Sequence, residues 1–223
     1  PNLAVIDCGG DAPADRIAIS HLLSLGVPDI DALVLTHAHS DHANGAEYLM
    51  KAVSTKAVYM PATDRENATF IDIADSAGKE CNTVFVGEDT IIELEGMEIK
   101  LLTLPLGSDE NENGLVVLVC DGEYELLITG DIATSNEKLV IDRIPDCESY
   151  IVGHHGSKTS SSQALLNRAL PELSVISVGE GNSYGHPSSQ AIKRIQNIGS
   201  EIRRTDTEGT MTFYSREKEE QAR

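Results

Sequence analysis

The chain has 223 residues, of which 17 are Lys or Arg and 36 are Asp or Glu, giving a formal net charge of −19; 40 % of the residues are hydrophobic. Recurring apolar runs exclude a disordered chain, and no run approaches the roughly 20 apolar residues that a membrane-spanning helix needs. The acidic charge argues against strong non-specific binding of nucleic acids, because their phosphates would meet a repulsive field. Length and composition together favour one compact α/β domain, with two half-domains that share a core as the alternative.

The first half of the chain alternates apolar runs with amphipathic segments. Apolar runs predict strands at 3–8, 32–36 and 56–60, and helical spacing predicts helices at 15–25, 45–52 and 65–77. Short strands are expected between 83 and 103, where Glu95-Gly96 marks a hairpin turn.

The second half begins with a strong hairpin signal, Asp121-Gly122, between strands at 115–119 and 124–129. Further strands are predicted at 150–152 and 175–178, and helices at 137–143, 161–168 and 188–197. A closing hairpin is expected to join 201–204 to 210–214 through Glu208-Gly209, and the charged tail 216–223 is expected to be a solvated end. Two strand-and-helix series of this kind suggest two sheets packed face to face with helices outside.

The four cysteines are scattered and form no CxxC pair, so we expect structural thiols rather than disulfides or metal ligands: Cys8, Cys81, Cys120 and Cys147. Pro1 in place of an initiator Met indicates a trimmed start. A preceding signal segment or domain therefore stays open, with a cytoplasmic location slightly favoured.

Histidine placement is the sharpest chemical signal in the sequence. Six of the seven histidines lie in three short loops after predicted strands, whereas His21 stands alone in a helix and is expected to be an ordinary surface or packing residue. The first loop places four potential ligands within six positions: His37, His39, Asp41 and His42. Imidazole and carboxylate suit Zn²⁺ and also Mn²⁺ or Fe, so this loop predicts a metal site.

Later loops supply further candidates. Asp131 follows a predicted strand and a glycine, where a carboxylate can bridge two metal ions once a histidine cluster is present. Because neighbouring side chains point to different sides, we expect one of His154 and His155 to bind metal and the other to donate a hydrogen bond or protonate a leaving group. His186 precedes Pro187, a residue favoured at the first helical position, and with the other histidines in place it is interpreted as a ligand.

These residues make the chain resemble the metallo-β-lactamase fold superfamily, whose HxHxDH signature is matched at positions 37–42. More narrowly, the chain resembles the hydrolase domain of the ComEC/Rec2 competence proteins, through the stretches 5–9, 128–132, 154–158, 182–188 and 204–209. The likeness lacks only the opening hairpin that such domains usually carry, so residues 1–223 are expected to form a single hydrolase domain. The expected fold is an α/β, four-layer αββα sandwich with the metal loops at one edge.

The resemblance implies two divalent metal ions, with Zn²⁺ favoured and Mn²⁺ or Fe as alternatives. It assigns one ion to His37, His39 and His154, the other to Asp41, His42 and His186, and a bridging role to Asp131. The sequence departs from the family pattern in two places. ComEC-type domains often carry Asp at the position of His39, and the histidine that many members place between the first motif and the bridging aspartate is absent from 104–113, so His154 is expected to replace it.

The expected activity is hydrolysis of phosphodiester bonds by a hydroxide that bridges the two ions. Asp41 and His155 are the candidate catalytic residues, and the candidates for binding an anionic small-molecule or nucleic-acid-like substrate are Asn113, Ser157, Lys158 and Tyr184. Alternatives are hydrolysis of β-lactams or thioesters by the same fold, and a non-enzymatic role as a metal-stabilised binding module or redox diiron protein. The sequence leaves the oligomeric state open.

Overall fold

The computed structural model describes residues 3–9, 14–27, 29–105 and 114–214. The chain divides into two compact units: unit 1 comprises Pro1–Thr90 and Leu101–Val116, and unit 2 comprises Ile91–Lys100 and Val117–Arg223. None of the helices in the described part of the chain has the length and apolar character to cross a bilayer. The charged tail 216–223 lies outside the described residues.

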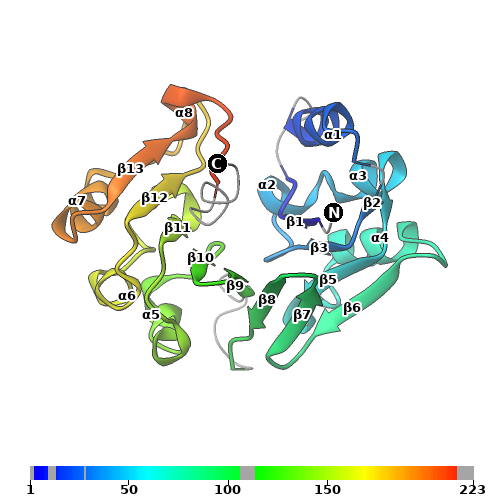
Figure 1. The fold of residues 1–223 in the computed structure, drawn as a ribbon, viewed down its shortest axis with the longest axis horizontal. Coiled ribbons are helices and arrows are strands. Elements are labelled where there is room, and N and C mark those ends of the chain that lie inside the picture. The colour runs from blue at the N-terminus through cyan, green and yellow to red at the C-terminus, as the bar shows by residue number, and fades with distance from the viewer. Residues whose placement is uncertain (1–2, 10–13, 28, 106–113, 215–223) are drawn as a thin grey trace, which may run out of the picture. The chain divides into compact units, whose positions relative to one another are not determined.

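Unit 1 contains a parallel sheet in the order β1-β3-β5-β6 (Figure 1). Its strands are β1 (Ala4–Ile6), β3 (Ala32–Val34), β5 (Ala57–Pro61) and β6 (Asn82–Val86), and β2 (Asp29–Ile30) pairs with β4 (Ser54–Thr55) in a separate ladder. The register places Val5 opposite Leu33 and Leu33 opposite Val58. Because the strands are parallel, their carboxyl ends share one edge, from which the chain continues into Asp7 and Thr36.

Helices supply the rest of the unit 1 core. They are α1 (Ala14–Ser24), α2 (Ser40–Ala43), α3 (Ala46–Ala52), the 3₁₀ turn η1 (Ala62–Asp64) and α4 (Ala68–Ser76). Leu33, Val58 and Met60 of the sheet belong to one buried cluster with Leu49 of α3 and Phe70 of α4. Full burial of an apolar side chain of this size contributes about 1.5–3 kcal/mol, so this cluster stabilises the sheet whose edge carries Asp7 and Thr36.

The second sheet is mixed and has the order β13-β12-β11-β10-β9-β8-β7. Its strands are β7 (Thr90–Leu94), β8 (Met97–Leu102), β9 (Val116–Asp121), β10 (Tyr124–Ile128), β11 (Ser149–Ile151), β12 (Leu173–Ile176) and β13 (Glu201–Arg204). Strands β10 to β13 are parallel, and β9 with β10 forms the expected hairpin, in which Gly122 adopts the positive φ of 65° that a tight turn requires.

Short helical segments connect the parallel strands of unit 2. They are α5 (Thr134–Glu137), η2 (Ile141–Arg143), η3 (Gly153–Gly156), α6 (Gln163–Ala169), α7 (Ser189–Asn197) and α8 (Thr205–Glu208), and α6 packs against α7. Ser162 caps α6 and Ser188 caps α7, each through a side-chain oxygen that accepts a backbone N–H. Pro187 is interpreted from the sequence as a residue at the first helical position. In the structure Ser188 is the N-cap, so Pro187 lies before α7.

Two other expectations are wrong. The helix expected at 137–143 is interrupted, because α5 ends at Glu137 and the tighter three-residue turns of η2 follow, with the amide of Val140 donating to the carbonyl of Glu137 at 3.1 Å. The Glu137 side chain accepts the amide of Ser162 at 2.8 Å. The closing hairpin is absent from the described residues: β13 pairs in parallel with β12, and the chain then coils into α8. The Thr205 hydroxyl accepts the amide of Val178 at 2.7 Å, which favours this turn over a return strand.

The α/β class and the other predicted strands and helices are confirmed to within a few residues at their ends. All four cysteines are free thiols. Burial raises the pKa of Cys8 and of Cys147 to about 12, so both thiols stay protonated and behave as structural groups. His21 lies exposed on α1, as expected.

Candidate metal centre

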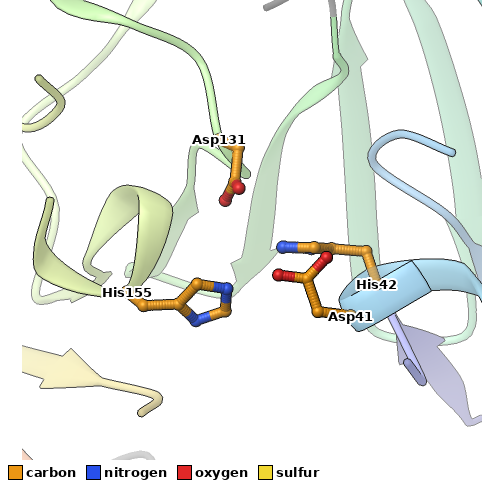
Figure 2. A group of neighbouring side chains, drawn as sticks. All are labelled: Asp41, His42, Asp131 and His155. Atoms are coloured by element: carbon orange, nitrogen blue, oxygen red, sulfur yellow. The ribbon is translucent and has the colours of Figure 1, made fainter. Parts of the chain in front are cut away.

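The carboxyl end of β3 carries the first group of candidate ligands. The chain continues through Thr36 and His37 into α2, whose N-cap is His39 and which contains Asp41 and His42. The ring centroid of His37 lies 4.7 Å from that of His39 and 4.0 Å from that of His42. His37 and His42 are buried, while His39 and Asp41 are exposed. One short segment therefore gathers three imidazoles and a carboxylate, and Figure 2 shows Asp41 and His42 projecting from α2.

Asp7 orients this group from the end of β1. Its carboxylate accepts the amide of Thr36 at 2.7 Å and the hydroxyl of Thr36 at 2.8 Å, and Oδ2 lies 2.8 Å from Nδ1 of His42. A carboxylate oxygen accepts, so Nδ1 of His42 donates. Because Thr36 gives its only hydroxyl proton to Asp7, its oxygen accepts from Nδ1 of His37 at 3.1 Å. Both imidazoles thus carry a proton on Nδ1 and a lone pair on Nε2, the tautomer of a metal-binding histidine held by an outer hydrogen bond.

Glycine allows the end of β1 to approach α2. A Cβ on Gly9 would collide with the backbone of Asp41 and His42, and the amide of Cys8 donates to the carbonyl of His42 at 2.9 Å. Asp7 itself has a φ of 55°, a left-handed conformation that Asp tolerates better than most residues. The sequence singled out this stretch only as part of a resemblance and gave Asp7 no role.

In unit 2 the carboxyl ends of β10, β11 and β12 carry the second group. Asp131 follows β10 and is 8 % exposed, His154 and His155 lie in η3 after β11, and His186 lies in the loop after β12. Nε2 of His154 lies 3.6 Å from Oδ2 of Asp131, and the rings of His154 and His186 are 5.8 Å apart. Unit 2 therefore brings Asp131, His154 and His186 together.

His155 points away from its neighbour. The ring centroids of His154 and His155 are 6.5 Å apart with planes at 76°, and both residues have left-handed backbone conformations, with φ of 49° and 53°. Nδ1 of His155 lies 2.7 Å from the carbonyl oxygen of Ser177. A carbonyl only accepts, so Nδ1 donates and Nε2 carries the lone pair. Figure 2 shows that Asp131 and His155 come from two different loops of unit 2.

Tyr150 holds the His154–His155 turn from the interior. Its fully buried hydroxyl accepts the amide of Gly153 at 3.0 Å and bonds with the hydroxyls of Thr129 at 3.1 Å and Ser161 at 2.8 Å. Burial raises the pKa of Tyr150 to about 12, so the hydroxyl keeps its proton. The strand end before Asp131 and the start of η3 are thereby joined through one side chain.

The residues expected to bind substrate differ in their surroundings. Ser157 is buried and its hydroxyl bonds with that of Thr159 at 3.0 Å, so it stabilises its own turn. Lys158 is exposed. Tyr184 is 83 % exposed and stacks on His186, with ring centroids 6.1 Å apart and planes at 21°. Asn113 lies outside the described residues.

The donor set fits a divalent metal ion. Each unit carries candidate ligands of its own: His37, His39, Asp41 and His42 in unit 1, and Asp131 and His155 in unit 2. Within the described part of the chain, Nδ1 of His186 is buried and has no hydrogen-bond partner, a state that a bound cation would relieve. Burial, and then the charges of His154 and His155, lower the pKa of His186, which favours the neutral imidazole that coordinates metals.

Known proteins are similar to this chain in sequence. Residues 2–180 match the model of the metallo-β-lactamase superfamily. The chain is 27 % identical over 206 residues to ComE operon protein 3 of Bacillus subtilis (strain 168), an alignment that covers 89 % of this chain and 26 % of that protein. It is 28 % identical over 214 residues to competence protein ComA of Neisseria gonorrhoeae, covering 94 % of this chain and 29 % of that one. The chain thus spans little more than a quarter of the length of these curated relatives.

A solved structure shows the same fold. YhfI from Bacillus subtilis, a metallo-β-lactamase fold protein, superposes with a TM-score of 0.60 over 90 % of this chain and 83 % of that one, at 14 % identity. The fold expected from the sequence is therefore confirmed, as is the narrower likeness to competence proteins. The chain belongs to the metallo-β-lactamase superfamily and is a distant homologue of the ComEC-type competence proteins.

Proposed function

We propose that this chain is a hydrolase of phosphodiester bonds that works with two divalent metal ions. The observation that carries the proposal is the anchoring of three imidazoles through Nδ1: His37 on Thr36, His42 on Asp7 and His155 on Ser177. Outer hydrogen bonds of this kind fix the tautomer and the orientation of metal ligands.

The proposed ligands follow the family pattern with one change. They are His37, His39, Asp41, His42, His155 and His186, with Asp131 as the bridge. We assign His155 the place that the sequence gave to His154, because the Ser177 carbonyl holds the proton of His155 on Nδ1, and a neutral imidazole of this tautomer carries its lone pair on Nε2. His154 lies beside the Asp131 carboxylate and is proposed to protonate the leaving oxygen.

The bound ions would supply a water of lowered pKa and neutralise charge that develops on the phosphate. Residues of the chain transfer the proton and bind the substrate. The exposed carboxylate of Asp41 accepts the proton of the attacking water, and the ammonium of Lys158 contacts a phosphate oxygen. The exposed ring of Tyr184 offers a face on which an aromatic part of the substrate stacks.

The substrate class rests on two facts. A homologue is named for competence, which favours a phosphodiester derived from a nucleic acid. The net charge of −19 leaves few Lys and Arg side chains to contact the phosphates of a duplex, so a short or single-stranded substrate fits better.

The test uses the purified chain, stripped with a chelator and reloaded with Zn²⁺ or Mn²⁺. Chromogenic phosphodiester, phosphomonoester and β-lactam substrates are compared, and we expect metal-dependent cleavage of the diester. Asp131→Ala is expected to lose metal and about 10²–10³-fold of the rate, because two cations without a bridging carboxylate repel each other. Cys120→Ser is the control and should stay near wild type. Preferential cleavage of the β-lactam would replace the proposed substrate class, and a metal-loaded chain without turnover would refute a hydrolase.

A further inference from the structure

The loop that carries His186 is held by the side chain of Asn182. The loop runs from residue 177 to residue 188, between β12 and α7. Nδ2 of Asn182 donates to the carbonyl oxygen of His186 at 2.7 Å and to that of Gly179 at 3.2 Å, and Oδ1 accepts the amide of His186 at 3.0 Å. One amide side chain therefore satisfies both backbone groups of the proposed ligand.

Contacts on the other side of His186 complete the support. The amide of Ser188 donates to the carbonyl of Gly156 at 2.9 Å, and a Cβ on Gly156 would lie 2.6 Å from Cβ of Pro187. The residue after His186 thus rests against the residue after His155. With both of its peptide groups fixed, the Cα–Cβ bond of His186 has a defined direction, although the loop contains no helix or strand.

We propose that Asn182 is a positioning residue that presents the imidazole of His186 to a divalent metal ion. The proposal rests on the proposed function only in taking His186 as a ligand. A loop that is already ordered loses little conformational entropy when it binds, so its affinity is higher than that of a loose loop. Independent support comes from Nδ1 of His186, which is buried and lacks a hydrogen-bond partner within the described residues, a state that coordination of a cation would relieve.

A purely structural asparagine looks different in this chain. Asn67, the N-cap of α4, accepts a bond from the amide of Thr69, which is not a candidate ligand. Asn182 instead makes a reciprocal pair of bonds to the backbone of His186, whose ring lies 5.8 Å from that of His154. A positioning role for Asn182 therefore predicts a change in Zn²⁺ affinity, whereas a structural role predicts only a change in stability.

The test is the variant Asn182→Ala of the full chain, with Zn²⁺ as the probe. Competition against a chromogenic chelator is expected to show one ion bound about 10- to 100-fold more weakly and the other unchanged. The visible spectrum of the Co²⁺-loaded protein should change with it, and His186→Ala should lose the same ion. Asn197→Ala is the matched control, because it removes one side-chain bond, to Gln163 at 3.1 Å, from α7; it should bind both ions as wild type does.

Wild-type Zn²⁺ affinities in Asn182→Ala would overturn the proposal, and so would equal weakening of both ions together with a matching fall in Tm. The two proposals fail separately. If the wild-type chain binds Zn²⁺ but does not cleave diesters, the proposed function is refuted. The Zn²⁺ affinities of Asn182→Ala then still decide whether Asn182 positions His186. A chain that cleaves diesters while Asn182→Ala binds Zn²⁺ normally refutes the positioning role alone. A chain that takes up no Zn²⁺ overturns both.

Discussion

Replacing Thr36 with Val tests whether outer hydrogen bonds set the metal affinity of unit 1. Thr36 is fully buried, and Val has nearly its shape but no hydroxyl. That hydroxyl donates to Asp7 at 2.8 Å and accepts from Nδ1 of His37 at 3.1 Å. In the variant, Nδ1 of His37 faces a methyl group. The imidazole then either keeps an unsatisfied proton on Nδ1 or moves it to Nε2, where the proton blocks coordination.

The magnitude follows from the geometry. Binding through Nε2 requires the tautomer with the proton on Nδ1, and an unsatisfied buried donor costs about 1–3 kcal/mol. With 1.4 kcal/mol for each factor of ten, the Zn²⁺ affinity should fall about 5- to 150-fold. The metal-free variant avoids most of this cost by adopting the other tautomer, so its free energy of unfolding should fall by only about 1–2 kcal/mol, from the lost bond to Asp7.

Two measurements separate these effects. Competition with a chromogenic chelator gives the Zn²⁺ affinity, and ¹⁵N NMR of the metal-free protein shows which nitrogen of His37 carries the proton. Thr36→Ser keeps the hydroxyl and should bind Zn²⁺ nearly as tightly as wild type. The reasoning is refuted if the valine variant binds Zn²⁺ with wild-type affinity, or if the serine variant is as weak as the valine variant.

Three further outcomes are expected. His155→Ala should bind less Zn²⁺, whereas His154→Ala should keep its metal and turn over more slowly; the opposite pattern in elemental analysis would restore His154 as the ligand. Tyr150→Phe should lower the free energy of unfolding by about 1–3 kcal/mol in denaturant titration, because the buried amide of Gly153 loses its acceptor; a change near zero would contradict this. The lowered pKa of His186 means that the unfolded chain binds more protons, so the metal-free protein should lose stability as pH falls below the ordinary value of 6.5. His186→Gln should flatten that part of the pH profile, and an unchanged slope would contradict the assignment.

The positions of the candidate ligands were predictable because each follows an apolar run. Thr36 and His37 follow β3, Asp131 follows β10, and His154 follows β11. Parallel strands present their carboxyl ends at one edge, so an apolar run that ends in histidine or aspartate is enough to place the side chain there. The spacing of histidine and aspartate within positions 37–42 then predicted a metal site without any knowledge of the contacts.

The anchors of those ligands were not predictable. Asp7 and Thr36 are 29 residues apart, and His155 and Ser177 are 22 apart. The Ser177 contact uses a backbone carbonyl, which every residue possesses, so no side-chain pattern can indicate it. The closing hairpin failed for a related reason, since the Thr205–Val178 bond that favours α8 joins segments 27 residues apart.

The paired histidines show where a local rule stops applying. Side chains alternate across an extended strand, and the expectation that His154 and His155 diverge rests on that alternation. The two residues do diverge, but they lie in η3 with φ of 49° and 53°, outside both strand and helix. In this conformation alternation gives no information about which ring faces which partner. The partners are instead set by contacts distant in the sequence: His154 lies beside the Asp131 carboxylate, and His155 bonds with the Ser177 carbonyl. The sequence could therefore predict that the two rings diverge, and only the structure could show which partner each ring contacts.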